Sequence, residues 1–249
     1  GFFFMLGNYI NSLLTSIDKQ FINWFGTTYQ FSFYSFALTM QSVMTIFITA
    51  ISQPLFPYMA SGNITGERYR EVKRDLLMLG SASGIAYFAC RLVVRNWIPK
   101  YVESLSVIEI YFAVFPAMAV INCLYFNLYK TRKMMKQYIV DLLMVLGIAA
   151  LADGGAVLSG HSYIGVCLVT TIVYYIWLFY GTRSFPELRF NRNELIFLAL
   201  FLILFFTISN SENEIFGMVV YFVLDFAICK ICFSKEVNSL SRRLIKDRR

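Results

Sequence analysis

The sequence has few charged residues, a single histidine and no nucleotide-binding motif. Asp, Glu, Lys and Arg make up 15% of its 249 residues, whereas soluble domains carry about 25%. It contains no GxxxxGK[ST] phosphate loop, so any transport has to be driven by an ion gradient or by the substrate gradient. His161 lies in a predicted short outer loop, Gly160-His161-Ser162, and no arrangement of a nucleophile or metal ligands around it is apparent. We therefore expect no enzyme activity and no cofactor.

Cysteine is also scarce, and its positions argue against redox or metal chemistry. All five cysteines lie inside apolar runs. Cys229 and Cys232 have the CxxC spacing, but no second pair accompanies them and the histidine is far away in the sequence. We interpret the cysteines as small apolar residues that fill space between helices.

Apolar residues dominate instead. They form 58% of the chain, which includes 25 Phe residues, and the mean hydropathy is +0.60. A helix needs about 20 residues to cross a hydrocarbon core of about 30 Å. This length predicts an all-α, polytopic bundle of transmembrane helices with about eight spans: 2–25, 31–51, 76–98, 105–129, 138–158, 163–180, 195–208 and 215–233. Pro54 and Pro57 are expected to end or kink the second span, and Pro116 to kink the fourth.

The basic residues lie between the apolar segments. The formal charge is +7, and 18 of the 22 Lys and Arg residues fall in the ranges 68–74, 130–136, 183–192 and 230–249. These ranges alternate with connections that carry few or no basic residues. By the positive-inside rule, this alternation predicts eight spans with both ends in the cytoplasm. We interpret the charge as a topology signal and expect no nucleic-acid partner.

The first sixty residues carry two polar faces, around which we expect the chain to be organised. In the first span, four polar residues follow one another at spacings of three, four and three, which places them on one face of a helix: Asn8, Asn11, Thr15 and Asp18. The second span has a similar face: Ser35, Ser42, Thr45, Thr49 and Ser52, with Gln41 beside it. We predict that Asn8, Asn11, Thr15, Asp18, Gln41 and Thr45 bind substrate along a path through the membrane. The alternative for the Ser and Thr residues is tight helix packing. The alternative for Asp18 is a place at the membrane interface, where it pairs with Lys19 or caps the following turn.

Other charged residues in apolar segments are further candidates. Arg91 is predicted to bind an anionic group of the substrate, although it could instead extend to the outer headgroups, as could Arg95. Glu109, Asp141 and Asp225 are additional acidic candidates. Asp225 is nearest mid-membrane, but we expect the last two spans to be peripheral. It could also pair with Lys230, although five residues is not an ideal spacing for such a pair.

Several motifs resemble one known family. In chain order they are Ile17-Asp18-Lys19-Gln20-Phe21-Ile22, Gly26, Phe33-Tyr34-Ser35-Phe36-Ala37, Pro57-Tyr58-Met59-Ala60, Ile98-Pro99-Lys100-Tyr101 and Asn127-Leu128-Tyr129-Lys130-Thr131-Arg132-Lys133. This pattern resembles the second half of a Wzx-type polysaccharide flippase, in the multidrug/oligosaccharidyl-lipid/polysaccharide exporter superfamily. The resemblance extends over the first 135 residues or so, and over most of the chain in topology.

The resemblance implies two facing six-helix bundles, of which residues 1–184 would be the second. Residues 185–249 would add a pair of membrane helices and a basic cytoplasmic tail. The chain starts with Gly1 rather than Met, and we expect a missing N-terminal half as its partner. The family moves lipid-linked oligosaccharide across the bacterial cytoplasmic (inner) membrane by alternating access. The resemblance thus implies a lipid-linked oligosaccharide substrate, surrounding membrane lipids, and H⁺ or Na⁺ as a coupling ion.

Three other functions stay open at this point. A cation-coupled multidrug exporter of the same superfamily would need a cavity dominated by carboxylates, against which Arg91 counts. A membrane polysaccharide polymerase or acyltransferase would need catalytic residues in a large outer loop, whereas the outer loops are short. The remaining alternative is a scaffold that transports nothing.

Overall fold

The computed structural model describes residues 2–61, 64–159, 163–234 and 236–237, and every regular element in these ranges is helical. The helices, in chain order, are α1 (Phe2–Leu14), α2 (Ile17–Phe25), α3 (Thr28–Ala60), α4 (Gly66–Ala82), α5 (Gly84–Trp97), η1 (Pro99–Ser104), α6 (Leu105–Ala113), α7 (Phe115–Ala119), η2 (Val120–Tyr125), α8 (Phe126–Thr131), α9 (Met135–Leu158), α10 (Tyr163–Tyr180), η3 (Gly181–Arg183), η4 (Pro186–Leu188), α11 (Arg192–Ile208) and α12 (Glu214–Cys232). The all-α prediction is confirmed. His161 and most of the expected basic tail, residues 238–249, lie outside the described residues.

Each of the eight predicted segments is helical, but not every one forms a helix long enough to cross a bilayer. Five helical stretches have the length and apolar composition of a membrane span, or six if the bent pair Pro99–Ala113 and Phe115–Thr131 counts as one. The first segment is divided between α1 and α2, and α11 has 17 residues. These apolar helices indicate a multi-pass membrane protein. The count of eight spans and the cytoplasmic location of both ends stay predictions.

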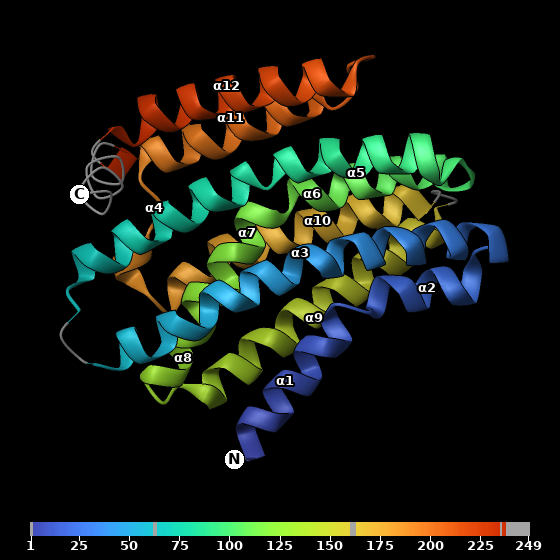
Figure 1. Ribbon diagram of the computed structural model, residues 1–249. Helices are drawn as coiled ribbons and strands as arrows, with labels where there is room; N and C mark the ends of the chain where they lie inside the picture. The colour runs from blue at the N-terminus through green and yellow to red at the C-terminus, as the bar shows by residue number, and fades with distance from the viewer. Residues whose placement is uncertain (1, 62–63, 160–162, 235, 238–249) are drawn as a thin grey trace.

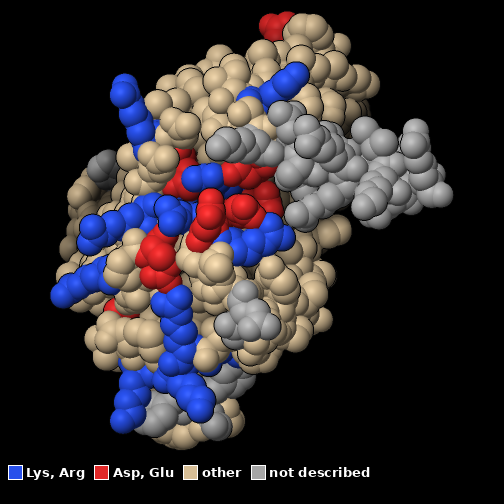
Figure 2. Space-filling model, turned by 90° about the vertical axis from the view of Figure 1, so that its left-hand side faces the viewer, with Lys and Arg blue, Asp and Glu red and all other residues tan. Residues whose placement is uncertain are grey.

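The helices run back and forth between two ends of an elongated bundle (Figure 1). The connections from α3 to α4, from α8 to α9 and from α10 to α11 lie at the left-hand end in Figure 1, together with the end of α12. The basic ranges 68–74, 130–136 and 183–192 belong to this end, and Figure 2 shows Lys and Arg gathered there around a group of acidic side chains. We call it the basic end, and the other one the opposite end.

The proline predictions have different outcomes. Helix α3 continues through Pro54 and Pro57 to Ala60, so neither proline ends it. The second half of α3 is held against η2 and α8, where the Asn127 Nδ2 donates to the carbonyl and the hydroxyl of Ser52 at 3.1 and 3.0 Å. Pro116 lies in the first turn of α7, beside a bend of 46°, so the kink predicted there is confirmed.

The hairpin of α11 and α12 packs on α4 and α5, rather than lying apart from the bundle (Figure 1). Towards the basic end, the Lys73 Nζ donates to the Glu194 Oε2 at 2.7 Å. Towards the opposite end, the Arg95 Nη1 donates to the Glu214 Oε1 at 2.7 Å. Polar contacts therefore join the hairpin to the rest of the protein near both of its ends. The division at residue 184 stays a prediction.

A glycine-to-alanine pair tests how closely α4 approaches α7. A Cβ at Gly80 would lie 2.4 Å from the Cα of Pro116 and 2.7 Å from its nitrogen, whereas a Cβ at Gly147 would have no neighbour within 4 Å. We expect Gly80→Ala to lower the free energy of unfolding by about 1–3 kcal/mol, because the contacted backbone cannot move aside cheaply. Gly147→Ala should be neutral or stabilising, since alanine favours the helix. Thermal unfolding in detergent micelles compares the two variants, and equal melting temperatures would contradict the close packing.

Candidate functional site

The site begins at the break between α1 and α2. The hydroxyls of Thr15 and Ser16 both donate to the Ser12 carbonyl, at 3.0 and 2.8 Å. Such local bonds compete with the helical pattern and favour a break. The chain resumes as α2 at Ile17, so Asp18 occupies the first turn of a new helix, where a negative charge is favoured. The polar face predicted for a single helix is thus built from two helices.

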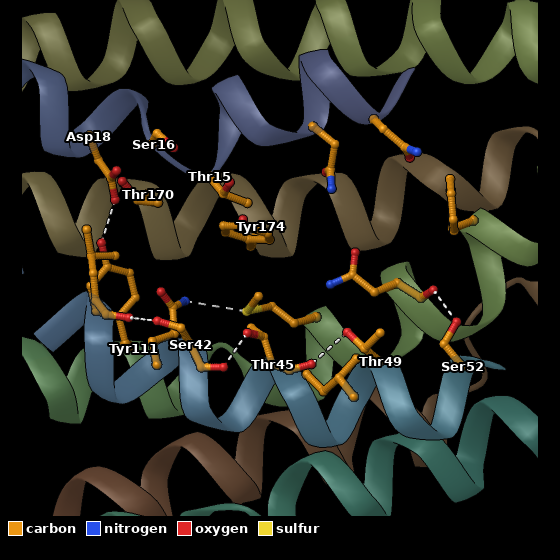
Figure 3. A pocket seen from close by; sticks show the side chains of 18 of the residues that line it. Thr15, Ser16, Asp18, Ser42, Thr45, Thr49, Ser52, Tyr111, Thr170 and Tyr174 are labelled. Atoms are coloured by element: carbon orange, nitrogen blue, oxygen red, sulfur yellow. Dashed lines mark hydrogen bonds between the residues drawn. The ribbon is translucent and has the colours of Figure 1, made fainter. Parts of the chain in front are cut away.

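A cavity of about 520 Å³ lies between this broken segment, α3 and the helices behind them (Figure 3). It is lined mainly by residues with amide or hydroxyl side chains, and it includes six of the seven predicted substrate-binding residues: Asn8, Asn11, Thr15, Asp18, Gln41 and Thr45. The structure therefore brings together the two polar faces recognised in the sequence. That these residues bind substrate stays a prediction.

Three of the α3 hydroxyl groups that line this cavity are bonded to their own helix, whereas that of Ser52 donates to the Asn122 carbonyl at 3.2 Å. Ser42 donates to the Leu38 carbonyl at 2.6 Å, and Thr45 donates to the Ser42 carbonyl at 2.7 Å. Thr49 donates to the Thr45 carbonyl at 2.9 Å. Each hydroxyl has thereby used its single proton, and its oxygen can still accept from a ligand. Ser35, the first residue of the predicted stripe, does not line the cavity.

The amide side chains add groups that can both donate and accept. Within the described part of the chain, the side chains of Asn8 and Asn11 have no hydrogen-bond partner. The Gln41 Nε2 lies 3.6 Å from the Met118 sulfur, a weak acceptor. These three amides are therefore available to a polar ligand inside the cavity.

The acidic end of the cavity is formed by Asp18, which is 2% exposed. The Tyr34 and Tyr111 hydroxyls donate to its Oδ2 at 2.6 and 2.5 Å, and the Lys19 backbone amide donates to its Oδ1 at 2.7 Å. The two tyrosine hydroxyls also lie 2.5 Å from each other, so the carboxyl group is the centre of a compact buried hydrogen-bond cluster that offsets the cost of burying it. The Lys19 ammonium contacts the Phe31 ring at 5.3 Å instead of pairing with Asp18, so the predicted alternative of an ion pair is not found.

A second carboxyl group, Asp153 of α9, lies behind the cavity wall. Its Oδ1 is 3.4 Å from the hydroxyl of Thr170, which lines the cavity and lies beside Asp18 in Figure 3. Asp153 is 0% exposed, and its Oδ2 is buried with no partner among the described residues. The Thr170 hydroxyl, which also lies 3.1 Å from the Val166 carbonyl, therefore lies between the cavity and a carboxyl group that has an unused oxygen.

The structure does not bring Arg91 to this cavity. Its Nη1 donates to the Ser209 carbonyl, at the C-terminus of α11, and its Nε lies 3.9 Å from the Glu214 Oε1. The negative end of a helix is a favourable place for a cation. Arg91 is 5% exposed and satisfied by these partners, so it belongs to the attachment of the C-terminal hairpin.

The other acidic candidates also lie outside the cavity. Asp141 accepts from the Tyr129 hydroxyl, from the Gln137 amide at 2.9 Å and from the Ser184 hydroxyl at 3.2 Å. Glu109 accepts from the Ser209 hydroxyl at 2.5 Å. Both carboxylates are used in contacts between helices.

The sequence analysis missed Asp153 and Thr170. Asp153 carries the signal that singled out Asp141, an acid inside an apolar run, and could have been found in that way. Thr170 carries no such signal, because its neighbours in the sequence are apolar or hydroxylated and a threonine in a membrane helix is common.

Comparisons with protein-family models, with curated proteins and with solved structures find no match for this chain. In the part of the chain that the structure describes, no group of three or more His, Cys, Asp or Glu residues could hold a metal ion.

Proposed function

We propose that this protein is part of a membrane transporter that moves lipid-linked oligosaccharide across the bacterial cytoplasmic membrane by alternating access. The observation that carries the proposal is the polar cavity enclosed by otherwise apolar helices. Polar groups inside a membrane are costly and usually mark the route of a substrate or an ion.

The lining of the cavity favours a carbohydrate as the polar part of the substrate. Sugar hydroxyls both donate and accept hydrogen bonds, and amide and hydroxyl side chains can do the same. The cavity offers Asn8, Asn11 and Gln41 together with the hydroxyl row of α3. Its volume of about 520 Å³ lies within the range of roughly 300–1,000 Å³ that is usual for small-molecule sites. Substrate groups larger than this would extend beyond the cavity.

The acidic end supports coupling to H⁺ or Na⁺. Asp18, Asp153 and Thr170 supply oxygen atoms, which are the preferred ligands of hard cations. A broken helix at an ion or substrate site is also a recurrent device of transporters. A cation that binds here would contact α1–α2, α9 and α10 together, and its binding would favour one arrangement of these helices over another.

The location of the lipid-linked oligosaccharide in the two leaflets tests the proposal. In cells that lack the gene, we expect the repeat unit to accumulate on its undecaprenyl carrier in the cytoplasmic leaflet, and surface polymer to be lost. The wild-type gene should restore the polymer. The triple variant Asn8→Leu/Asn11→Leu/Gln41→Leu, which removes three of the four amides that line the cavity, should restore less of it at equal protein level. Unpolymerised repeat units in the outer leaflet would instead identify a polymerase.

A cation-coupled exporter of small molecules is the second candidate, and the acidic end is the observation that favours it. Arg91 no longer counts against this function, because it lies outside the cavity. The same cells separate the two candidates. Unchanged glycan lipids, together with greater sensitivity to cationic drugs, would support the exporter and contradict the flippase.

A further inference from the structure

A buried carboxyl group lies between α12 and α4, away from the polar cavity. Asp225 is 5% exposed and occupies the middle of α12. Its Oδ2 lies 3.2 Å from the hydroxyl of Ser81, which is fully buried. Its Oδ1 is buried and has no partner among the described residues. None of the ion pairs formed in this part of the chain includes Asp225.

The proton count at Ser81 indicates the charge of this carboxyl group. The Ser81 Oγ lies 2.9 Å from the Met78 carbonyl as well as 3.2 Å from Asp225. A hydroxyl carries one proton, so it cannot donate to both. If Ser81 donates to Met78 and Asp225 carries a proton on Oδ2, both short contacts become hydrogen bonds and no charge is buried. A carboxylate would have one donor at most, in a layer where an unpaired charge is costly.

We propose that Asp225 is a proton-binding site and that its bound proton holds α12 against α4. The neighbouring contacts make this interface close. The Tyr221 hydroxyl donates to the Ser81 carbonyl at 2.6 Å, and a Cβ at Gly84 would lie 2.4 Å from that hydroxyl. The protonated Asp225 and Tyr221 therefore both bond to Ser81, and these contacts hold α12 to α4 at the same depth of the bundle.

Among the described residues, no cation pairs with Asp225. Lys230 follows it on α12 by five residues, but it is exposed and forms no ion pair with it. The other titratable groups nearest in position on α12 and on the helices packed against it are Tyr221 and Cys229 on α12, Tyr87 and Cys90 on α5, and Asp75 on α4, while α11 has its charged residues only in its first turn. Tyrosine and cysteine are ordinarily neutral at pH 7. Asp75 precedes Ser81 by six residues, about 9 Å along the helix. It would add a like charge rather than compensate one.

The sign of the pH dependence follows from the proton count. The docked form of α12 holds the proton, and a form in which Asp225 meets water releases it above about pH 4, the ordinary pKa of an aspartic acid. The docked form therefore binds one more proton than the undocked form. Docking is complete in acid and weakens as the pH rises, with the undocked population increasing by up to about tenfold per pH unit.

Alkylation of Cys229 reports the docking directly. This thiol is one turn from Asp225 and 7% exposed. In purified protein with the other four cysteines changed to alanine, we would measure its rate of reaction with N-ethylmaleimide from about pH 4.5 to pH 8, a range that begins just above the pH at which a hydrated aspartic acid ionises. The matched variant is Asp225→Asn, whose amide can donate to Ser81 as the neutral acid does, but which cannot lose a proton.

Dividing the rate of the Asp225 protein by that of Asp225→Asn removes the ionisation of the thiol itself. We expect this ratio to rise with pH, by up to about tenfold per unit. A ratio that stays constant would overturn the proposal. So would an Asp225→Asn protein that reacts rapidly at every pH, because then a charge rather than a proton would hold the interface. The melting temperature of the protein with its native cysteines should show the same contrast.

Discussion

Glu194→Gln is expected to lower the free energy of unfolding by about 3–5 kcal/mol, the usual cost of removing one partner from a buried ion pair. Lys73 is 0% exposed, and its ammonium donates to Glu194 at 2.7 Å and to the Leu188 carbonyl at 2.9 Å. Without the carboxylate, the buried ammonium would retain only carbonyl partners and the Phe190 ring, which lies 4.2 Å from it.

Two further contacts of this side chain are affected: the pairing with Arg74 is lost, whereas the capping box is only weakened, because a glutamine oxygen can still accept there. The Glu194 carboxylate accepts from the Asn191 backbone amide at 2.9 Å, completing a capping box at the start of α11. It also pairs with the Arg74 Nε at 3.1 Å. One side chain thus joins α4, the connection before α11 and α11 itself, which is why we expect a large effect.

Thermal unfolding in detergent micelles is the measurement. Glu71→Gln is the matched control, because its ion pair with Arg68 joins side chains that are 38% and 36% exposed and should contribute only about 0–1 kcal/mol. The double variant Lys73→Met/Glu194→Leu should recover part of the stability, since it leaves no buried charge without a partner. Equal melting temperatures for Glu194→Gln and Glu71→Gln would show that the buried pair does not hold the hairpin.

Asp18→Asn is expected to reduce ion-driven transport at least about tenfold, which corresponds to about 1.4 kcal/mol of lost cation affinity. The change keeps the size of the side chain and removes the charge to which Tyr34 and Tyr111 donate. An amide has one oxygen where the carboxylate has two, so fewer ligand atoms remain for a cation.

The test is the movement of a fluorescent lipid-linked oligosaccharide from one leaflet of proteoliposomes to the other under an imposed Na⁺ or H⁺ gradient. Asp153→Asn should act in the same direction, because this carboxyl group lies on the other side of Thr170. Glu67→Gln, on the exposed start of α4, is the control and should leave transport unchanged. Transport by Asp18→Asn that equals the wild type would remove the acidic end from the mechanism.

The sequence was most informative where a pattern repeats along one helix. The spacing of Asn8, Asn11 and Asp18 identified a polar face, and these residues do line one cavity. The break within this segment was not predicted, because the hydroxyls of Thr15 and Ser16 are compatible with a continuous helix as well as with a bond to Ser12. Periodicity determines which residues share a face, but not where local bonds interrupt it.

The sequence could not determine which helix each face meets. Arg91 and Asp18 look alike as charged residues in apolar segments, yet one contacts the end of α11 and the other a polar cavity. Asp153 approaches the cavity only because α9 and α10 pack together, which brings it to Thr170. Contacts between distant segments follow from tertiary packing, and a single sequence carries no direct signal for them.

The length of α3 has a consequence for how the protein meets the two faces of the bilayer. Its 33 residues span about 50 Å at 1.5 Å per residue, whereas the hydrocarbon core is about 30 Å thick. Pro54 and Pro57 lie in the last third of the helix, where they deprive the carbonyls of Ala50 and Gln53 of their backbone donors. A helix about 20 Å longer than the core is thick extends beyond the core unless it is strongly tilted. Where α3 extends, water can hydrate the two carbonyls that lack a backbone donor.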